Sequence, residues 1–116
     1  MILIVDDDQN MRTLLERALN EYSVVTACSS DALRIMAEGK VSLLITDFAM
    51  PDLDGLQLSK LAKKLYNIPS IIMTGHTDQL NYLKKRVEDV IEKPFTVADL
   101  KSLIIKTLDK KHESTV

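Results

Sequence analysis

The chain has 116 residues but only one cysteine, Cys28, and it has no long apolar run. A lone cysteine can form neither an internal disulfide nor a CxxC metal site, so a reducing compartment and a cytoplasmic location are expected. The apolar runs are far shorter than the ~20 residues that a membrane span requires. Three aspartates, Asp6 to Asp8, stand where a signal peptide would carry positive charge, so no export signal is predicted.

An excess of either charge is also missing. Fifteen Lys and Arg residues oppose seventeen Asp and Glu residues, for a net charge of -2. Such a balance provides no electrostatic footprint for a nucleic-acid backbone, so direct DNA binding by this chain is not expected. Internal repeats, low-complexity tracts and Pro/Gly-rich linkers are absent as well. We therefore expect one domain over residues 1–110, followed by a short polar tail over residues 111–116.

Short apolar stretches alternate with segments of helical periodicity. Four of the stretches run into Asp6–Asp8, Asp47, Thr74 and Lys93. Between them, apolar residues recur three and four positions apart, which is typical of one face of a helix. The residues expected to face the core are Met11, Leu14, Leu15, Ala18 and Leu19, then Leu33, Met36 and Ala37, then Leu58, Leu61, Ala62 and Leu65, and finally Leu100, Leu103, Ile104 and Leu108.

This alternation predicts an α/β fold. The stretches are too uniformly apolar for strands that face water on one side, which favours a parallel sheet covered by helices on both faces. Strict strand–helix alternation gives a (βα)5 doubly wound sheet, and right-handed crossovers favour the flavodoxin-like strand order 2-1-3-4-5. Two segments resemble capping boxes and predict where helices begin: Asp54 to Gln57, and Thr96 to Asp99.

The polar residues at the strand ends form the candidate site. In an open α/β sheet, ligands bind at the carboxyl ends of the strands, so Asp6, Asp7, Asp47, Thr74 and Lys93 should lie together. Two carboxylates 4 Å apart repel by about 4 kcal/mol at an effective dielectric near 20, so positive charge must compensate them. Lys93 supplies part of that charge, and Mg²⁺ with its preference for carboxylate oxygens would supply the rest. The pocket would then accept a phosphoryl group on a carboxylate, most simply that of Asp47.

In these residues the chain resembles the receiver domain of two-component response regulators. The matching motifs are Ile4-Val5-Asp6-Asp7, Asp47 followed by Met50-Pro51 and Asp54-Gly55, Thr74-Gly75, and Lys93-Pro94-Phe95. The resemblance implies that a sensor histidine kinase or a histidine phosphotransfer protein donates a phosphoryl group to the chain, which relays the signal to a downstream protein by conformational change. By this resemblance the chain catalyses its own phosphotransfer and dephosphorylation and is not a turnover enzyme. The short apolar runs, separately, predict no membrane partner.

The same resemblance assigns roles to individual residues. Asp47 would be the phosphoacceptor, and two further residues, Thr74 and Lys93, would contact the phosphoryl oxygens. Asp7, Asp47 and the backbone carbonyl of Ala49 would ligate Mg²⁺ directly, whereas Asp6 would act mainly through a bound water. The Lys93–Pro94 peptide bond would be cis.

The chain departs from the receiver pattern in two places. Relatives often carry Tyr or Phe three positions before the lysine, where this chain has Val90, so the aromatic half of the usual switch is missing. The interval from Thr74 to Lys93 is also shorter than usual. We therefore expect a short or irregular fourth helix, with Leu80, Leu83 and Val87 on its inner side. The response to phosphorylation should be smaller or differently routed than in relatives with the aromatic residue, for example an ordering of the loop from Gly75 to Gln79.

Two other functions fit parts of the sequence. A haloacid-dehalogenase-like phosphatase would use Asp6 as nucleophile and Asp8 as general acid, and Mg²⁺ with them. Against it, Asn10 occupies a position where that family carries Thr or Val, a cap domain has no room, and Asp47 would have no role. Asp8 is instead expected to lie in a solvated loop or to cap a helix. The second alternative is a receiver-like interaction module that takes no phosphoryl group.

Overall fold

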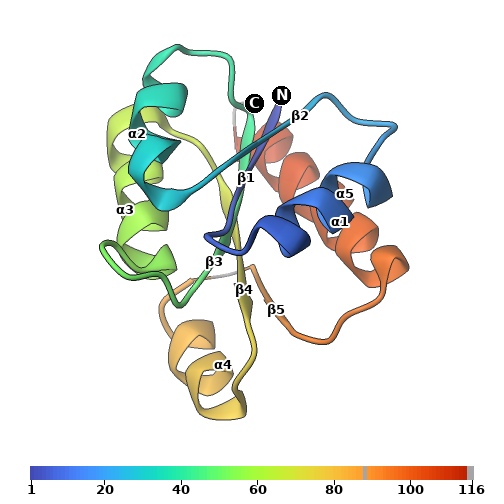
Figure 1. Cartoon of the computed structure of the whole chain (residues 1–116). Coiled ribbons are helices and arrows are strands. Elements are labelled where there is room, and N and C mark those ends of the chain that lie inside the picture. The colour runs from blue at the N-terminus through green and yellow to red at the C-terminus, as the bar shows by residue number, and fades with distance from the viewer. Residues whose placement is uncertain (88, 115–116) are drawn as a thin grey trace.

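The computed structural model describes residues 1–87 and 89–114, in which five strands alternate with five helices (Figure 1). The strands are β1 (Ile2–Val5), β2 (Val24–Ala27), β3 (Leu43–Asp47), β4 (Ser70–Thr74) and β5 (Val90–Glu92). The helices are α1 (Gln9–Ala18), α2 (Ser29–Ala37), α3 (Gly55–Tyr66), α4 (Thr77–Lys84) and α5 (Val97–Ser114). Within the described ranges, no helix combines the length and apolar character that crossing a membrane demands.

All five strands lie parallel in one sheet with the order β2-β1-β3-β4-β5, which confirms the predicted topology. The register pairs Asp47 with Met73 and Thr74 with Glu92. The last residues of β3, β4 and β5 therefore lie side by side, and the loops that follow them leave the sheet at one edge. This edge is where the candidate site was expected.

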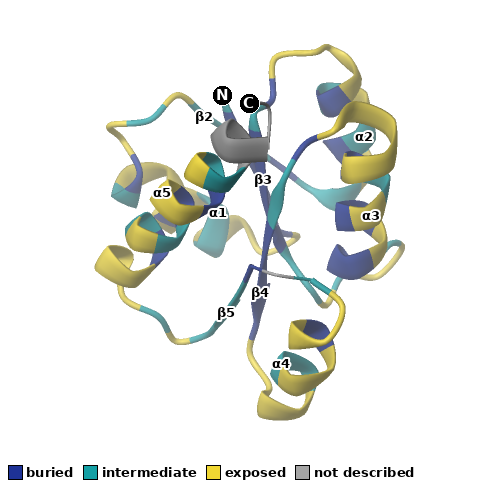
Figure 2. Ribbon diagram, turned by 180° about the vertical axis from the view of Figure 1, so that it is seen from behind, coloured by how far each residue is buried: buried dark blue, intermediate teal, exposed yellow. Residues whose placement is uncertain are grey.

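The core has a layer on each face of the sheet, because successive side chains of a strand point in opposite directions. Ile2 and Ile4 of β1 pack with α1 and α5 on one face, whereas Leu3 and Val5 pack with α2 and α3 on the other. Figure 2 shows buried residues along the central strands and on the inner sides of the helices. Both faces are covered, which explains the uniformly apolar strands.

Three residues that helical spacing assigned to the core are exposed instead. Leu14 exposes 60% of its surface and Leu65 exposes 54%, and Ala37 is exposed as well. Consecutive residues of a helix point about 100° apart, and α1 turns Leu15 toward the sheet and Leu14 away from it. Ala37 and Leu65 lie in the last turns of α2 and α3, where no further turn follows to cover them.

Local signals at the helix starts agree with the structure. The Asp54 carboxylate accepts from the Gln57 amide at 2.8 Å, and the Gln57 side chain accepts from the Asp54 amide at 3.1 Å, which completes the capping box of α3. At the start of α5 the Thr96 hydroxyl accepts from the Asp99 amide at 3.0 Å. These bonds satisfy backbone donors that the first turn of a helix leaves free.

The fourth helix is short, as expected. With eight residues α4 is the shortest of the described helices, and Val87 lies beyond its end. Val87 still packs against the cluster that buries Leu83, so its apolar side faces inward as predicted. Helix α5 continues to Ser114, into the segment expected as a polar tail, whose last two residues, 115 and 116, lie outside the described residues.

Candidate functional site

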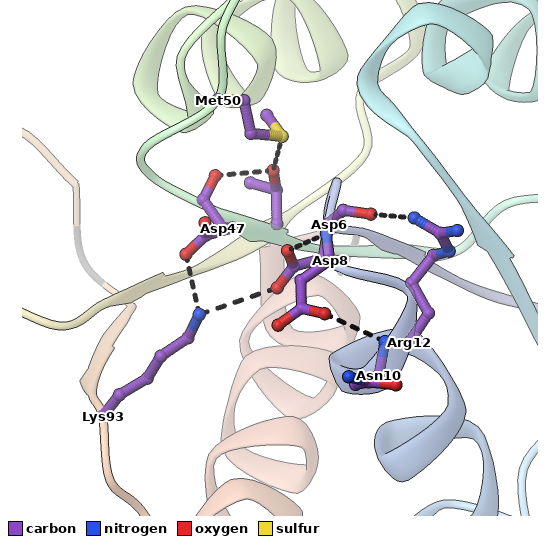
Figure 3. A network of polar contacts seen from close by, with 8 residues as sticks. Asp6, Asp8, Asn10, Arg12, Asp47, Met50 and Lys93 are labelled. Atoms are coloured by element: carbon purple, nitrogen blue, oxygen red, sulfur yellow. Dashed lines mark hydrogen bonds and ion pairs between the residues drawn. The ribbon is translucent and has the colours of Figure 1, made fainter.

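The ammonium group of Lys93 joins the ends of three strands. Its Nζ lies 3.0 Å from Oδ1 of Asp47 and 3.6 Å from Oδ2 of Asp6 (Figure 3). Asp6 directly follows β1, Asp47 ends β3 and Lys93 directly follows β5. The side chain of Asp47 is 16% exposed and that of Lys93 is 25% exposed, so solvent reaches both groups. The Lys93–Pro94 bond is cis, as the resemblance implied.

Asp6 is the buried acid of this group. Only 3% of the residue is exposed, and its Oδ1 accepts the Asp8 amide at 2.9 Å. Its Oδ2 is buried without a hydrogen-bond partner, because 3.6 Å to Lys93 is too long for a hydrogen bond. Burial raises the pKa of the Asp6 carboxyl; the bond from Asp8 and the charge of Lys93 oppose this, and the charge of Asp47 adds to it.

The raised pKa of Asp6 predicts a pH-dependent effect on stability. Because the folded pKa exceeds the unfolded value of 3.8, the folded chain binds this proton more tightly. The stability that Asp6 contributes is therefore complete below the unfolded pKa and is lost as the pH rises through the folded pKa. Asp6→Asn keeps a side-chain oxygen that can accept from the Asp8 amide. In urea denaturation with EDTA present, we expect this variant to have a higher free energy of unfolding than wild type at pH 7, and the difference should shrink toward pH 4. An advantage that grows toward pH 4 would contradict this.

Asp7 lies at the same edge, but its carboxylate faces α2. It accepts from the Ser29 amide at 3.0 Å and from the Ser29 hydroxyl at 3.4 Å. Ser29 is the first residue of α2, whose free amides and positive dipole end favour an anion there. In the part of the chain that the structure describes, no group of three or more His, Cys, Asp or Glu side chains is arranged to hold a metal ion. The direct Mg²⁺ ligands Asp7, Asp47 and Ala49 thus stay a prediction.

Asp8 is the N-cap of α1, as expected from the sequence. Its carboxylate accepts from the Asn10 amide at 2.9 Å, and the residue is exposed. Arg12, one turn into the same helix, donates to the backbone carbonyl of Asp6 at 2.6 Å. These bonds give the first acidic loop a fixed path from β1 into α1, with Asp6 turned inward and Asp8 turned outward.

Thr74 is buried, and its hydroxyl makes two hydrogen bonds. It donates to Oε1 of Gln79 at 2.6 Å and accepts from the His76 amide at 3.4 Å. The backbone carbonyl of the same residue accepts from the Lys93 amide at 2.7 Å, which ties the ends of β4 and β5 together. Sequence reasoning missed Gln79 as a site residue, since a single amide side chain on a short helix has many structural explanations.

The loop after Asp47 returns tightly to the sheet. The Gly55 amide donates to the Phe48 carbonyl at 2.9 Å. A Cβ at Gly55 would collide with the Asp47 carbonyl oxygen and would come within 2.9 Å of the Phe48 Cα. Gly55 is therefore the residue that lets α3 begin against the backbone of Asp47. Ala49, in the same loop, is exposed.

Comparison with known sequences gives a consistent result. A family model for the response regulator receiver domain matches residues 2–105. The chain is 32% identical over 119 residues to the DNA-binding transcriptional regulator NtrC of Proteus hauseri, an alignment that covers 97% of this chain and 25% of that protein. It is 37% identical over 109 residues to the probable transcriptional regulator ycf27 of Cyanidium caldarium, covering 89% and 44%. The chain thus spans less than half the length of these two relatives.

Solved structures agree with the family match. A response regulator receiver protein from Sinorhizobium medicae is similar with a TM-score of 0.82 and 26% identity, over 93% of each chain. A response regulator receiver domain protein from Clostridium thermocellum is similar with a TM-score of 0.77 and 28% identity, over 96% of this chain and 95% of that one. Together with the sheet order and the match over residues 2–105, these likenesses show that the chain belongs to the response regulator receiver domain family.

Proposed function

We propose that this chain is a phosphoacceptor switch. It takes a phosphoryl group from a sensor histidine kinase or a histidine phosphotransfer protein onto Asp47 and signals to a downstream protein by changing conformation. The observation that carries the proposal is the ion pair between Lys93 and Asp47, with 3.0 Å between Nζ and Oδ1. It lies at the carboxyl edge of the sheet, and both side chains are partly exposed to solvent. An ammonium group in that place can hold a phosphoryl oxygen as well as the carboxylate.

The transfer itself is a displacement at phosphorus. An oxygen of the Asp47 carboxylate forms the new P–O bond, and the P–N bond of the donor phosphohistidine breaks. The donor imidazole leaves with the electron pair of that bond, and a proton on its other ring nitrogen makes it neutral. With acetyl phosphate the broken bond is P–O and the leaving group is acetate. Lys93 and Thr74 stabilise charge on the transferred oxygens, which is how proteins catalyse most phosphoryl transfers.

The residues present fit a Mg²⁺ ion. The donors are all oxygens, and the buried Oδ2 of Asp6 lacks a hydrogen-bond partner, as an acceptor reserved for a water on the ion would. Asp7, Asp47 and the Ala49 carbonyl would hold the ion; the Asp7 carboxylate in this structure accepts from Ser29. Bound Mg²⁺ neutralises negative charge where the phosphoryl group enters. Lys93, whose ammonium group also lies near Asp6, keeps the partly exposed Asp47 carboxylate oriented for attack on phosphorus.

The phosphatase alternative is less well supported by the geometry. Its nucleophile would be Asp6, which is 3% exposed, and its general acid would be Asp8, whose carboxylate caps α1. Asp47, by contrast, is accessible and paired with Lys93. We therefore infer that the chain is phosphorylated once, and that it does not turn over phosphate esters.

The stoichiometry of phosphorylation tests this function. With acetyl phosphate and Mg²⁺, intact-mass measurement is expected to show uptake that stops at one phosphoryl group per chain, and EDTA is expected to prevent it. The same protein should release no more p-nitrophenol from p-nitrophenyl phosphate than buffer does. Continuous turnover of that ester would favour the phosphatase, and no uptake at any Mg²⁺ concentration would favour the interaction module.

The partners proposed for this chain are proteins. The relatives named above are transcriptional regulators, and one of them is described as DNA-binding. The chain matches only 25% of that protein, and its own net charge of -2 gives no footprint for DNA. We therefore assign to this chain the exchange of a phosphoryl group with a histidine-bearing protein and contact with a downstream protein, in the cytoplasm.

A further inference from the structure

The Thr74 hydroxyl can donate only one hydrogen bond, and in this structure its acceptor is the side-chain oxygen of Gln79. The donor and acceptor oxygens are 2.6 Å apart, and Thr74 is 1% exposed, so water does not compete for the bond. The hydroxyl oxygen also accepts from the His76 amide, which leaves the proton directed at Gln79. If Thr74 is to donate to a phosphoryl oxygen, its bond to Gln79 has to break.

Gln79 belongs to the first turn of α4, and this turn is tied to the sheet by side-chain hydrogen bonds. Besides the bond from Thr74, the Thr77 hydroxyl donates to the Glu92 carboxylate at 3.0 Å. The other end of α4 is held differently, because Leu83 is fully buried in a cluster with Leu56 and Ile72. The end of α4 is therefore held by apolar packing, and its start is held by hydrogen bonds.

The first residue of β5 cannot carry the signal by an aromatic swing. Val90 is half-buried and packs against the cluster around Leu83, and a valine side chain has no ring to move between an outer and an inner position. Within the described residues, the Thr74 hydroxyl has two hydrogen bonds to the start of α4: it accepts from the amide of the N-cap residue His76 at 3.4 Å, and it donates to the Gln79 side chain at 2.6 Å. Only the bond to Gln79 uses the hydroxyl proton.

We propose that Gln79 is the positioning residue that couples Thr74 to helix α4. This inference rests on the proposed phosphorylation of Asp47. A phosphoryl oxygen is a charged acceptor, and charge-assisted hydrogen bonds are roughly twice as strong as neutral ones, so Thr74 leaves the Gln79 amide for it. The first turn of α4 then loses its hydrogen bond from Thr74 to Gln79 and keeps the one from Thr77 to Glu92, while Leu83 keeps the far end in place. Phosphorylation loosens the start of α4 and leaves its end packed.

Hydrogen exchange of the Leu80 amide measures this coupling. That amide donates to the His76 carbonyl at 3.0 Å and closes the first turn of α4. In wild type, beryllofluoride with Mg²⁺ is expected to lower its protection about fivefold, the effect of one net hydrogen bond. In Gln79→Ala the protection is expected to be lower by the same factor without beryllofluoride, and beryllofluoride then adds little.

Two further variants separate the hydrogen bond from the side chain. Gln79→Glu keeps an acceptor oxygen of the same reach, so its protection without beryllofluoride is expected to match that of wild type. Asn81→Ala removes an exposed amide from the same helix and is expected to change neither the protection nor the response. Agreement of both with wild type would attribute the loss in Gln79→Ala to the bond with Thr74.

The outcomes distinguish this inference from the function on which it rests. Amide shifts of residues 47–49 report whether beryllofluoride binds at Asp47 in each protein. If those shifts occur and Gln79→Ala keeps a wild-type protection and a wild-type response at Leu80, the role of Gln79 is overturned and the function stands. If beryllofluoride shifts none of those amides in wild type, the phosphoacceptor function fails, and the coupling fails with it.

Discussion

The Asp47→Asn variant is expected to take up no phosphoryl group from acetyl phosphate and Mg²⁺ under conditions that phosphorylate the wild type fully. An amide oxygen carries no charge and is a poor nucleophile, so the displacement at phosphorus has no attacking group. The variant should fold, because the amide oxygen of the asparagine can still accept from Lys93. In wild type the Lys93 Nζ lies 3.0 Å from Oδ1 of Asp47, the oxygen that the amide oxygen replaces. Intact mass after a fixed reaction time measures the uptake.

A neighbouring carboxylate provides the matched control for Asp47→Asn. Asp52 lies in the same loop and is exposed, so Asp52→Asn makes the same chemical change away from Lys93. We expect wild-type uptake in this control. Uptake by Asp47→Asn at the wild-type level would move the acceptor elsewhere and would remove the basis of the proposed function.

Replacing Gly55 by alanine is expected to destabilise the fold by about 3 kcal/mol, the upper end of the range for overpacking. The new Cβ would meet the Asp47 carbonyl oxygen and the Phe48 Cα, and neither is the flexible end of a side chain that could move aside. Strand β3, Asp47 or the start of α3 must shift instead. For a domain of this size the melting temperature should fall by at least roughly 10 °C, as measured by circular dichroism.

Gly75→Ala is the control for this second prediction. A Cβ at Gly75 meets nothing within 4 Å, and the backbone of Gly75 does not adopt the left-handed conformation that alanine avoids. Its melting temperature should stay close to that of wild type. Equal losses in the two variants would mean that glycine flexibility, and not the contact with Asp47, governs the result.

Much of the site could be predicted because its information is local. Each of Asp6, Asp47, Thr74 and Lys93 ends or follows a short apolar stretch, and a parallel sheet necessarily brings such ends to one edge. The strand order was one of the few topologies that right-handed crossovers leave, and the start of α3 followed from the Asp54 capping box. None of these inferences needed a side-chain conformation.

What the sequence could not provide was the direction in which individual side chains turn. Asp7 follows the same strand as Asp6, yet its carboxylate accepts from Ser29, because the start of α2 competes for an anion at that edge. The partner of Thr74 was missed, since Gln79 comes into reach only through the path of the loop before α4. Leu14 was misplaced because both it and its neighbour fit the helical spacing.

The chemical position of the phosphoryl group tests the central claim most directly. Borohydride reduces an aspartyl phosphate to homoserine, so fragment-ion sequencing of the phosphorylated, reduced protein identifies the acceptor. We expect homoserine in place of Asp47 alone. Homoserine in place of Asp6, or a phosphoryl group that resists reduction on another residue, would contradict the account.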